Sequence, residues 1–279
     1  MAKERMIVKK FQLKPGINKC TNEEYHGDNS YFSSTSVKLL LEDPKKFYEQ
    51  AIEGKREFKH IPAFDEGSYA HALILEPEVI DAEFAFYPGL RRAGNKFKEF
   101  EAANKGKIIL SNGQKMRVES WVEAYKRLPA AKELVSGGLP EHTVVGSINN
   151  MPLKARADYL NIDRGYIADV KTTSYDTDVD SFRMTIGQFK YQLSAALYCA
   201  MFEQYYEKPF DFYFIVLGKR SLDCQVYKMS NKTMMDGKSK LYKAIKTYNK
   251  CKESGLWVKE GSSVEGLDSE ISDYEILEV

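Results

Sequence analysis

The sequence contains few of the features that mark secreted, zinc-binding or membrane proteins. Only four of its 279 residues are cysteines, and no two of them form a CxxC pair. Neither a disulfide framework nor a zinc site is therefore indicated. The longest uninterrupted apolar run, AALYCAMF at 195–202, is too short to cross a bilayer, and the start, MAKERMIVKKF, has no apolar signal core. These absences predict a soluble protein of the cytoplasm with no membrane partner.

What the chain does contain is an uneven distribution of charge. The net charge is +1, but residues 260–279 hold seven acids and no Lys or Arg, which leaves +8 on residues 1–259. A basic body is typical of a protein that binds a polyanion. A solvated surface followed by an acidic tail explains the same numbers equally well, and the role of that tail stays open.

Helical and strand-like patterns alternate along the chain. Helical spacing covers residues 33–54 with a break at Pro44, 65–78, 111–132, 187–206 and 231–254. Strand-like runs cover residues 141–148, 153–160, 165–171, 210–218 and 222–229. Turn sequences separate the first three strand-like runs, which predicts an antiparallel meander. The whole order predicts an α/β fold with a mixed central β-sheet flanked by helices.

The stretch KARADYLNIDRGYIADVKTT, residues 154–173, places two acids and a base on the second and third strands of this meander. Ten residues separate Asp158 from Asp169 across a tight turn. Facing side chains of adjacent strands lie about 4.5–5.5 Å apart at Cβ. Lys171 follows Asp169 by two positions and so shares its face of the strand. We therefore expect the three groups to converge on one point.

Such a group of side chains has a chemical use. Two partly buried carboxylates repel each other unless a hard cation such as Mg²⁺ neutralises them. A cation held there can polarise a phosphodiester and activate water, while the lysine orients that water or accepts its proton. The alternative is an ordinary salt bridge between Asp169 and Lys171. A carboxylate in a central apolar strand is costly without a partner, which favours the functional interpretation, hydrolysis of a phosphate ester.

Three separate motifs resemble one known family. The run ARADYL…GYIADVKTT, followed by KYQLSAALY, is similar to the PD-(D/E)XK core of RecE-type exonucleases (exonuclease VIII-like) from phage and prophage recombination systems. NEEYHGDNSYFSSTSVKLLLEDPKKF and DEGSYAHALILEPE resemble the earlier motifs of that family. The resemblance implies a restriction-endonuclease-like core in a single domain, residues 25–259. A polar segment, 1–24, would precede this domain and the acidic tail, 260–279, would follow it.

Carried over residue by residue, the resemblance implies a metal site and a catalytic set. The metal ligands would be His71, Asp158, Asp169 and the carbonyl of Val170, with Lys171 serving the attacking water beside the catalytic Asp158 and Asp169. The ion would be Mg²⁺, with Mn²⁺ able to substitute. Residues expected to contact DNA are Arg156, Thr172, Thr173, Tyr191 and Gln192. Residues expected near the site are Glu76, Glu141 and Tyr198.

The residues by themselves leave several of these roles open. His71 also fits a hydrogen-bonded core histidine, and Arg156 can neutralise the acids instead of binding a phosphate. The two threonines can simply cap the end of the strand. One position departs from the family, because Ser194 stands where related nucleases carry a Gln that contacts DNA or supports the site.

The resemblance also implies a function and partners. It describes a Mg²⁺-dependent exonuclease that degrades linear double-stranded DNA from the 5′ end and leaves a 3′ single strand for an annealing protein. Enzymes of this kind form ring-shaped assemblies that enclose the duplex, so the resemblance implies a homo-oligomer. It also implies a location in the cytoplasm of a bacterial host. Two alternatives stay open: a non-catalytic DNA-binding scaffold, and a nuclease specific for single strands or flaps. The basic cluster from Arg91 to Lys107 is a candidate DNA contact or a solvated surface.

Overall fold

The centre of the molecule is a six-stranded mixed sheet. The computed structural model describes residues 12–55, 62–89 and 91–258. Within them the sheet has the order β1-β4-β5-β6-β7-β8. Its strands are β1 (Gly16–Asn18), β4 (Leu139–Ile148), β5 (Met151–Asn161), β6 (Tyr166–Thr173), β7 (Asp211–Gly218) and β8 (Cys224–Lys228). Strands β6 and β7 run parallel, and the other neighbours in this sheet are antiparallel. The predicted meander and the mixed sheet are both confirmed.

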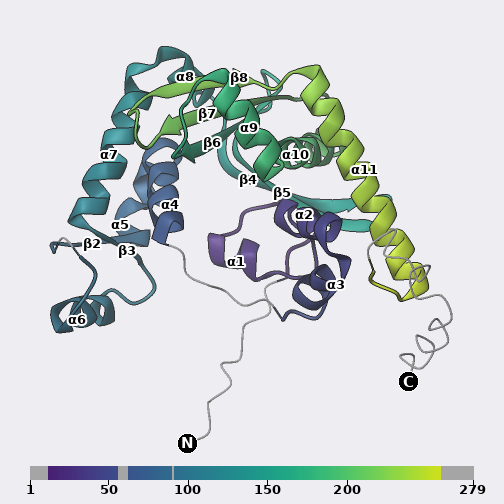
Figure 1. Ribbon diagram of the computed structural model, residues 1–279, viewed down its shortest axis with the longest axis horizontal. Helices are drawn as coiled ribbons and strands as arrows, with labels where there is room; N and C mark the ends of the chain where they lie inside the picture. Colours follow the sequence, from purple (N-terminus) through teal and green to yellow (C-terminus); the bar gives the residue numbers. More distant parts are fainter. Residues whose placement is uncertain (1–11, 56–61, 90, 259–279) are drawn as a thin grey trace, which may run out of the picture.

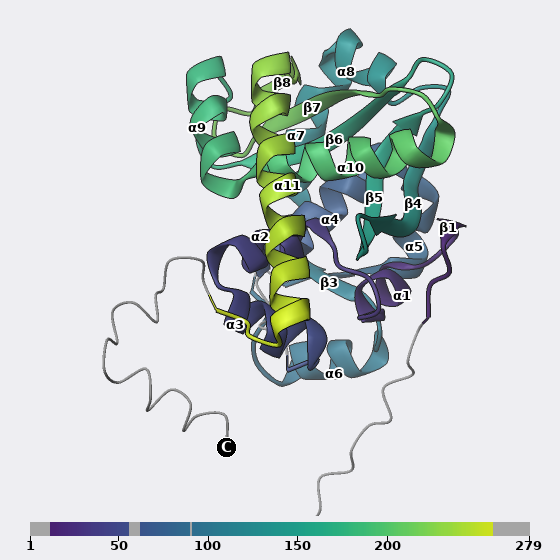
Figure 2. The ribbon, with the colours of Figure 1, turned by 90° about the vertical axis from the view of Figure 1, so that its right-hand side faces the viewer.

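Helices cover both faces of this sheet (Figures 1 and 2). One face packs against α2 (Ser34–Glu42), α3 (Pro44–Phe47), α9 (Val179–Phe189), α10 (Tyr191–Tyr206) and α11 (Asn231–Ser254). The other packs against α4 (Pro62–Leu75), α7 (Asn112–Arg127) and α8 (Pro129–Leu134). The fold is therefore a sheet between two helical layers, each with its own apolar core.

The strand β6 alternates between these two cores. Ile167 lies in the core beside α10, whereas Ala168 and Val170 lie in the core beside α4 and α7. Because successive side chains of a strand point to opposite faces, Asp169 and Lys171 point toward the α10 side. The alternation of β5 is interrupted next to the site, since Ala157 and Leu160 belong to the same core although three positions separate them.

A small parallel pair of strands forms a second sheet beside the second helical layer. Its strands are β2 (Phe84–Tyr87) and β3 (Ile108–Ser111), with α6 (Asn95–Ala103) between them. Figure 1 shows α6 away from the central sheet, beyond β2 and β3. The short elements η2 (Pro77–Val79) and α5 (Ile80–Glu83) connect α4 to β2. This strand pair was not among the strand-like runs predicted from the sequence.

Two predicted helices are each divided in two. The helix expected over 111–132 ends at Arg127, because Leu128 is extended before Pro129 as residues preceding proline usually are. Within the helix expected over 187–206, α9 ends at Phe189 and α10 begins at Tyr191. Lys190 separates them and has a left-handed φ of 50°. The break at Pro44 is confirmed, with α3 continuing into a π-type turn, η1 (Tyr48–Ile52).

The start of the chain joins the domain earlier than the predicted boundary at residue 25. Strand β1 pairs with β4, and α1 (Asn22–Gly27) buries Tyr25. Residues 1–11 and the acidic tail 260–279 lie outside the described residues, so the expectations for them stay predictions. Among the described helices, none is both long and apolar enough to span a membrane.

Candidate metal and catalytic site

The strands β5 and β6 separate at the two predicted acids. Their pairing covers only Tyr159–Asn161 against Tyr166–Ala168, so Asp158 and Asp169 lie just beyond the last pair. The Asp158 carboxylate does not face Asp169 across a ladder. It accepts a hydrogen bond from the backbone N–H of Val170, with Oδ2 and N 2.8 Å apart. A side chain thus replaces the backbone pairing and leaves room for a site between the strands.

Three side chains from different elements meet at this point. One donor atom from each of His71 (α4), Glu141 (β4) and Asp158 (β5) lies within 4.8 Å of the others. His71 Nδ1 is 3.5 Å from Asp158 Oδ2, and His71 Nε2 is 2.9 Å from the carbonyl oxygen of Val170. His71, Asp158 and the Val170 carbonyl, three of the predicted ligands, are therefore adjacent.

This donor set fits a divalent cation. Burial lowers the pKa of His71, although Asp158 opposes this, so the imidazole is neutral near pH 7. A neutral imidazole has one N–H and can donate to only one of its two neighbours, the Val170 carbonyl and the Asp158 carboxylate. A cation would satisfy the remaining pair of acceptors. Carboxylate, carbonyl and imidazole groups are all ligands of divalent cations in proteins.

Glu141 reaches the site through an unusual backbone conformation. Its φ of 45° is left-handed, and the ladder between β4 and β5 skips Glu141 and Asp158. A non-glycine residue in this conformation costs about 1–2 kcal/mol. Burial and, to a smaller extent, the nearby Asp158 raise the pKa of Glu141 to about 8. The sequence predicted Glu141 only near the site, whereas the structure places it within the cluster of possible ligands.

Asp169 and Lys171 lie on the α10 side of β6. Their side chains form an ion pair, with the Asp169 side chain 6% and the Lys171 side chain 25% exposed. Burial alone would lower the pKa of Lys171, but Asp169 and Asp158 outweigh it and hold this pKa above its usual value. Lys171 Nζ also lies 3.4 Å from the Val170 carbonyl. Lys171 is therefore a protonated group at the edge of the cluster, oriented by Asp169.

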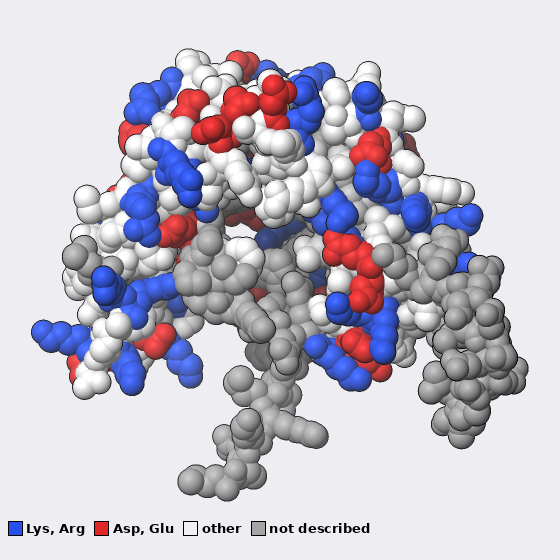
Figure 3. Space-filling view, in the orientation of Figure 1, with Lys and Arg blue, Asp and Glu red and all other residues white. Residues whose placement is uncertain are grey.

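A cleft of about 650 Å³ opens over this cluster. Figure 3 shows a hollow near the centre of the molecule, with acidic and basic side chains visible inside it. The predicted site residues that line the cleft are His71, Glu76, Glu141, Arg156, Asp158, Val170, Lys171, Thr172, Tyr191 and Tyr198. The structure therefore brings most of the predicted residues together, and their functional roles stay predictions.

Arg156 is held in place by Glu141 and by two residues of the first helix. Its guanidinium lies 4.5 Å from the ring centroid of Tyr25, its Nε is 2.9 Å from Glu141 Oε2, and it donates to Asn22. The helix α1 thus lies against the side of Arg156 and lines the same cleft. This position serves both interpretations of Arg156, since it neutralises Glu141 and also borders the space that a phosphate would enter.

Three predicted residues do not line the cleft. Asp169 lines a smaller neighbouring cavity. Gln192 is buried, and its Nε2 donates to Asp236 of α11 at 3.0 Å. Thr173 is buried, and its hydroxyl accepts a hydrogen bond from the N–H of Tyr175 at 3.0 Å. The positions of Gln192 and Thr173 favour structural roles, helix packing and capping of the strand end, over DNA contact.

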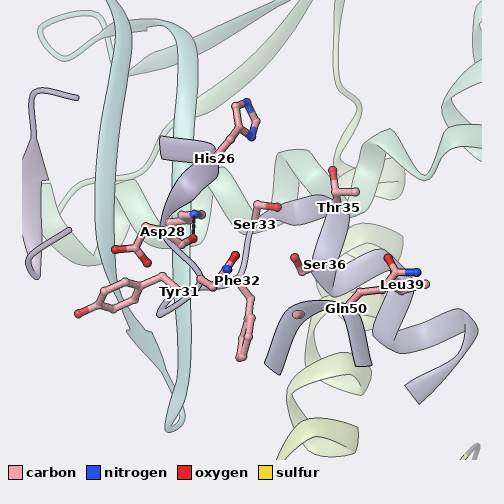
Figure 4. Close-up of a pocket in the computed structure, with 12 residues that line it drawn as sticks. His26, Asp28, Tyr31, Phe32, Ser33, Thr35, Ser36, Leu39 and Gln50 are labelled. Atoms are coloured by element: carbon pink, nitrogen blue, oxygen red, sulfur yellow. Dashed lines mark hydrogen bonds between the residues drawn. The ribbon is translucent and has the colours of Figure 1, made fainter. Parts of the chain in front are cut away.

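A separate pocket of about 60 Å³ lies at the start of α2 (Figure 4). Its polar residues are occupied with local structure. The carboxylate of Asp28 accepts hydrogen bonds from the N–H groups of Leu13 and Ser30, both at 2.6 Å. Lys154 Nζ donates to the carbonyls of Tyr25 and Asp28, both at 2.5 Å. These hydrogen bonds attach the residues before α2 to β5. We therefore assign this pocket a structural role and no chemistry.

Comparison with known proteins identifies the family. A structural neighbour from Eubacterium rectale, described as a "putative exonuclease", superposes with a TM-score of 0.59 at 15% identity, over 90% of this chain and 98% of that chain. This likeness shows the fold. No curated protein matches the sequence significantly. The profile of one family, described as a PDDEXK-like domain of unknown function (DUF3799), matches residues 33–269. Since that match spans most of the sequence, the chain belongs to this PDDEXK-like family.

Proposed function

We propose that the protein is a metal-dependent deoxyribonuclease that hydrolyses phosphodiester bonds of DNA in the cleft above β5 and β6. The observation that carries this proposal is the meeting of His71, Glu141, Asp158 and the Val170 carbonyl, beside the ammonium of Lys171. These groups fit one divalent cation and one anionic substrate. Membership of a PDDEXK-like family supports the same reaction.

The residues of the chain have distinct tasks in this reaction. A divalent cation in the cluster would polarise the phosphodiester and lower the pKa of a bound water. Lys171 Nζ, protonated and fixed by Asp169, can hold the attacking water by a hydrogen bond or balance charge on a phosphate oxygen. Arg156, whose guanidinium borders the cleft, supplies a second positive charge for the substrate.

The finer proposal is an exonuclease of the RecE type. The three resembling motifs support it, and so does the fold shared with the E. rectale protein described as a "putative exonuclease". Under this proposal the substrate is the end of linear double-stranded DNA, the direction is 5′ to 3′, and Mg²⁺ is the cation. A ring-shaped homo-oligomer and a single-strand annealing partner belong to the same proposal.

The test uses purified protein and labelled DNA. Linear 5′-labelled duplex, the same duplex as a closed circle, single-stranded DNA and a flap are each incubated with Mg²⁺, Mn²⁺ or EDTA. We expect loss of the linear duplex only, with both Mg²⁺ and Lys171 required. Lys171→Ala is the test variant, and Lys132→Ala, an exposed lysine on α8, is its control.

The other outcomes are equally informative. Cleavage of circles would exclude an exonuclease, and cleavage of only single strands or flaps would favour the alternative nuclease. Binding that weakens with salt, without cleavage of any DNA by the wild type, would favour the DNA-binding scaffold.

A further inference from the structure

A second cavity lies behind the cleft, on the α10 side of β6. It has a volume of about 140 Å³ and shares Lys171, Tyr191 and Tyr198 with the cleft. The helix α2 closes it with Ser34 and Lys38. The cavity therefore adjoins the candidate site, and these three side chains contact both spaces.

Lys38 is the unexplained residue of this cavity. Among the described residues, no carboxylate lies within ion-pair distance of its ammonium, whereas Lys171 pairs with Asp169. Glu42, one turn further along α2, pairs with Lys190 instead. The ammonium of Lys38 instead lies over the ring of Tyr191, whose centroid is 5.5 Å from Nζ. A largely buried ammonium without an anion is costly, so an anionic ligand would stabilise it.

The charges around Lys38 also favour an anion. Lys171 Nζ lies 5.5 Å from the centroid of the same Tyr191 ring, so two ammonium groups approach one aromatic side chain. Burial and, to a smaller extent, the nearby Lys171 lower the pKa of Lys38 to about 8, although Asp169 opposes this. Asp169 also lines this cavity, and its negative charge is balanced by its own ion pair with Lys171. The cavity therefore has one positive charge in excess.

The size and the hydroxyl groups of the cavity indicate which anion it takes. Ser34 and Ser194 lie in its wall and carry hydroxyl groups that can donate to an oxyanion. A longer side chain at position 194, such as Gln, would occupy part of this space. We propose that the cavity binds a phosphate group of the substrate strand, held mainly by Lys38. The phosphate belongs either to a backbone phosphodiester next to the cleavage site or to a terminal monoester.

This inference rests on the proposed function only for the identity of the ligand as DNA. Affinity of the cavity for phosphate does not require cleavage. The first experiment is therefore thermal unfolding of the full chain in EDTA, with inorganic phosphate or chloride at equal ionic strength. The variants are Lys38→Met, which removes the charge, and Ser194→Gln, which fills the space. Lys45→Met, an exposed lysine on α3, is the control.

We expect phosphate to raise the melting temperature of the wild type and of Lys45→Met more than that of Lys38→Met and Ser194→Gln. A general effect of phosphate on hydration would appear equally in all four proteins. In chloride, Lys38→Met should melt no lower than the wild type, because it removes an unpaired charge. Equal responses of all four proteins, or a large loss of stability in Lys38→Met, would overturn the proposal.

The second experiment identifies the source of the phosphate. Binding of oligonucleotides with a 5′-phosphate or a 5′-hydroxyl is measured in EDTA, where metal-dependent hydrolysis does not proceed. We expect Lys38→Met to weaken binding about tenfold, the size typical of one charge-assisted hydrogen bond. Loss with both oligonucleotides assigns a backbone phosphodiester, and loss with the phosphorylated one alone assigns a terminal monoester. Unchanged binding of both would contradict a phosphate site at Lys38.

Discussion

The carboxylate of Asp158 accepts a hydrogen bond from the backbone N–H of Val170, at the point where β5 leaves β6. This bond makes Asp158 both a candidate metal ligand and a structural partner of the strand that carries Lys171. The same contact brings the Asp158 carboxylate beside His71. Chemistry and local structure are therefore coupled at one side chain, and substitutions can separate the two.

Substitutions of Asp158 should distinguish its two roles. Asp158→Asn keeps an oxygen that accepts from Val170 but loses the charge, whereas Asp158→Ala loses both. We expect both variants to lose cleavage by a factor of about 100 or more. Only Asp158→Ala should lose about 1–3 kcal/mol of stability, because it leaves the Val170 N–H without its partner. DNA cleavage and urea unfolding measure these effects, and wild-type cleavage by Asp158→Asn would remove Asp158 from the metal site.

Replacing only Asp169 of its ion pair with Lys171 should lower the free energy of unfolding more than replacing both residues. Asp169→Ala leaves the Lys171 ammonium uncompensated in a largely buried position. We expect a clear loss of unfolding free energy, with about 3–5 kcal/mol as the upper bound reached by fully buried pairs. The double variant Asp169→Ala/Lys171→Met should recover most of it, while both variants stay inactive. A double-mutant cycle by urea unfolding tests this, and additive losses would show that the pair is not coupled.

Stability should depend on pH through Glu141. The pKa of this carboxyl is raised to about 8 by burial, from 4.5 in the unfolded chain. Between about pH 5 and 8 the folded state therefore holds a proton that the unfolded state has lost, so Glu141 lowers stability as pH rises. In EDTA, the melting temperature of Glu141→Gln should rise relative to that of the wild type over this window. A constant difference from pH 5 to 8 would contradict the raised pKa.

The affinity for a metal ion should also depend on the protonation of Glu141. It should increase with pH over the range in which Glu141 lowers stability. A carboxylate must lose its proton before it binds a cation, so affinity for Mn²⁺ should increase as pH rises toward the pKa of Glu141. Calorimetric titration of the wild type at several pH values measures this increase. Glu141→Gln should bind Mn²⁺ more weakly and with a smaller dependence on pH. Identical titration curves for the two proteins would exclude Glu141 as a ligand.

Two glycines test the packing behind the site. A Cβ added at Gly237 of α11 would lie only 2.0 Å from the backbone oxygen of Gln192 on α10. We expect Gly237→Ala to separate these helices and to cost about 1–3 kcal/mol. Gly187 of α9 has open space around its position, so Gly187→Ala should be neutral or stabilise by about 0.5–1 kcal/mol. Urea unfolding compares the two, and equal effects would show that the contact between α10 and α11 adjusts freely.

The local features of the site were predictable from the sequence. The alternation of apolar residues in β6 and the turn before it predicted a meander, with Asp169 and Lys171 on one face, and the structure has both. The division of the helix before Tyr191 was not predicted, because both halves have helical spacing. Nothing in the sequence around Lys190 predicts its left-handed backbone conformation.

The sequence by itself determined the fold class and the placement of Asp158 and Asp169 on adjacent strands. Both follow from strand alternation and turn chemistry, which act between residues close in the chain. Only the tertiary structure decided that Glu141 joins His71 and Asp158, that Tyr25 supports Arg156 and that Lys38 faces a cavity without a carboxylate partner among the described residues. These contacts join α1, α2 and α4 to strands that follow much later in the chain. Such contacts depend on how the helical layers pack on the sheet, which no local periodicity encodes.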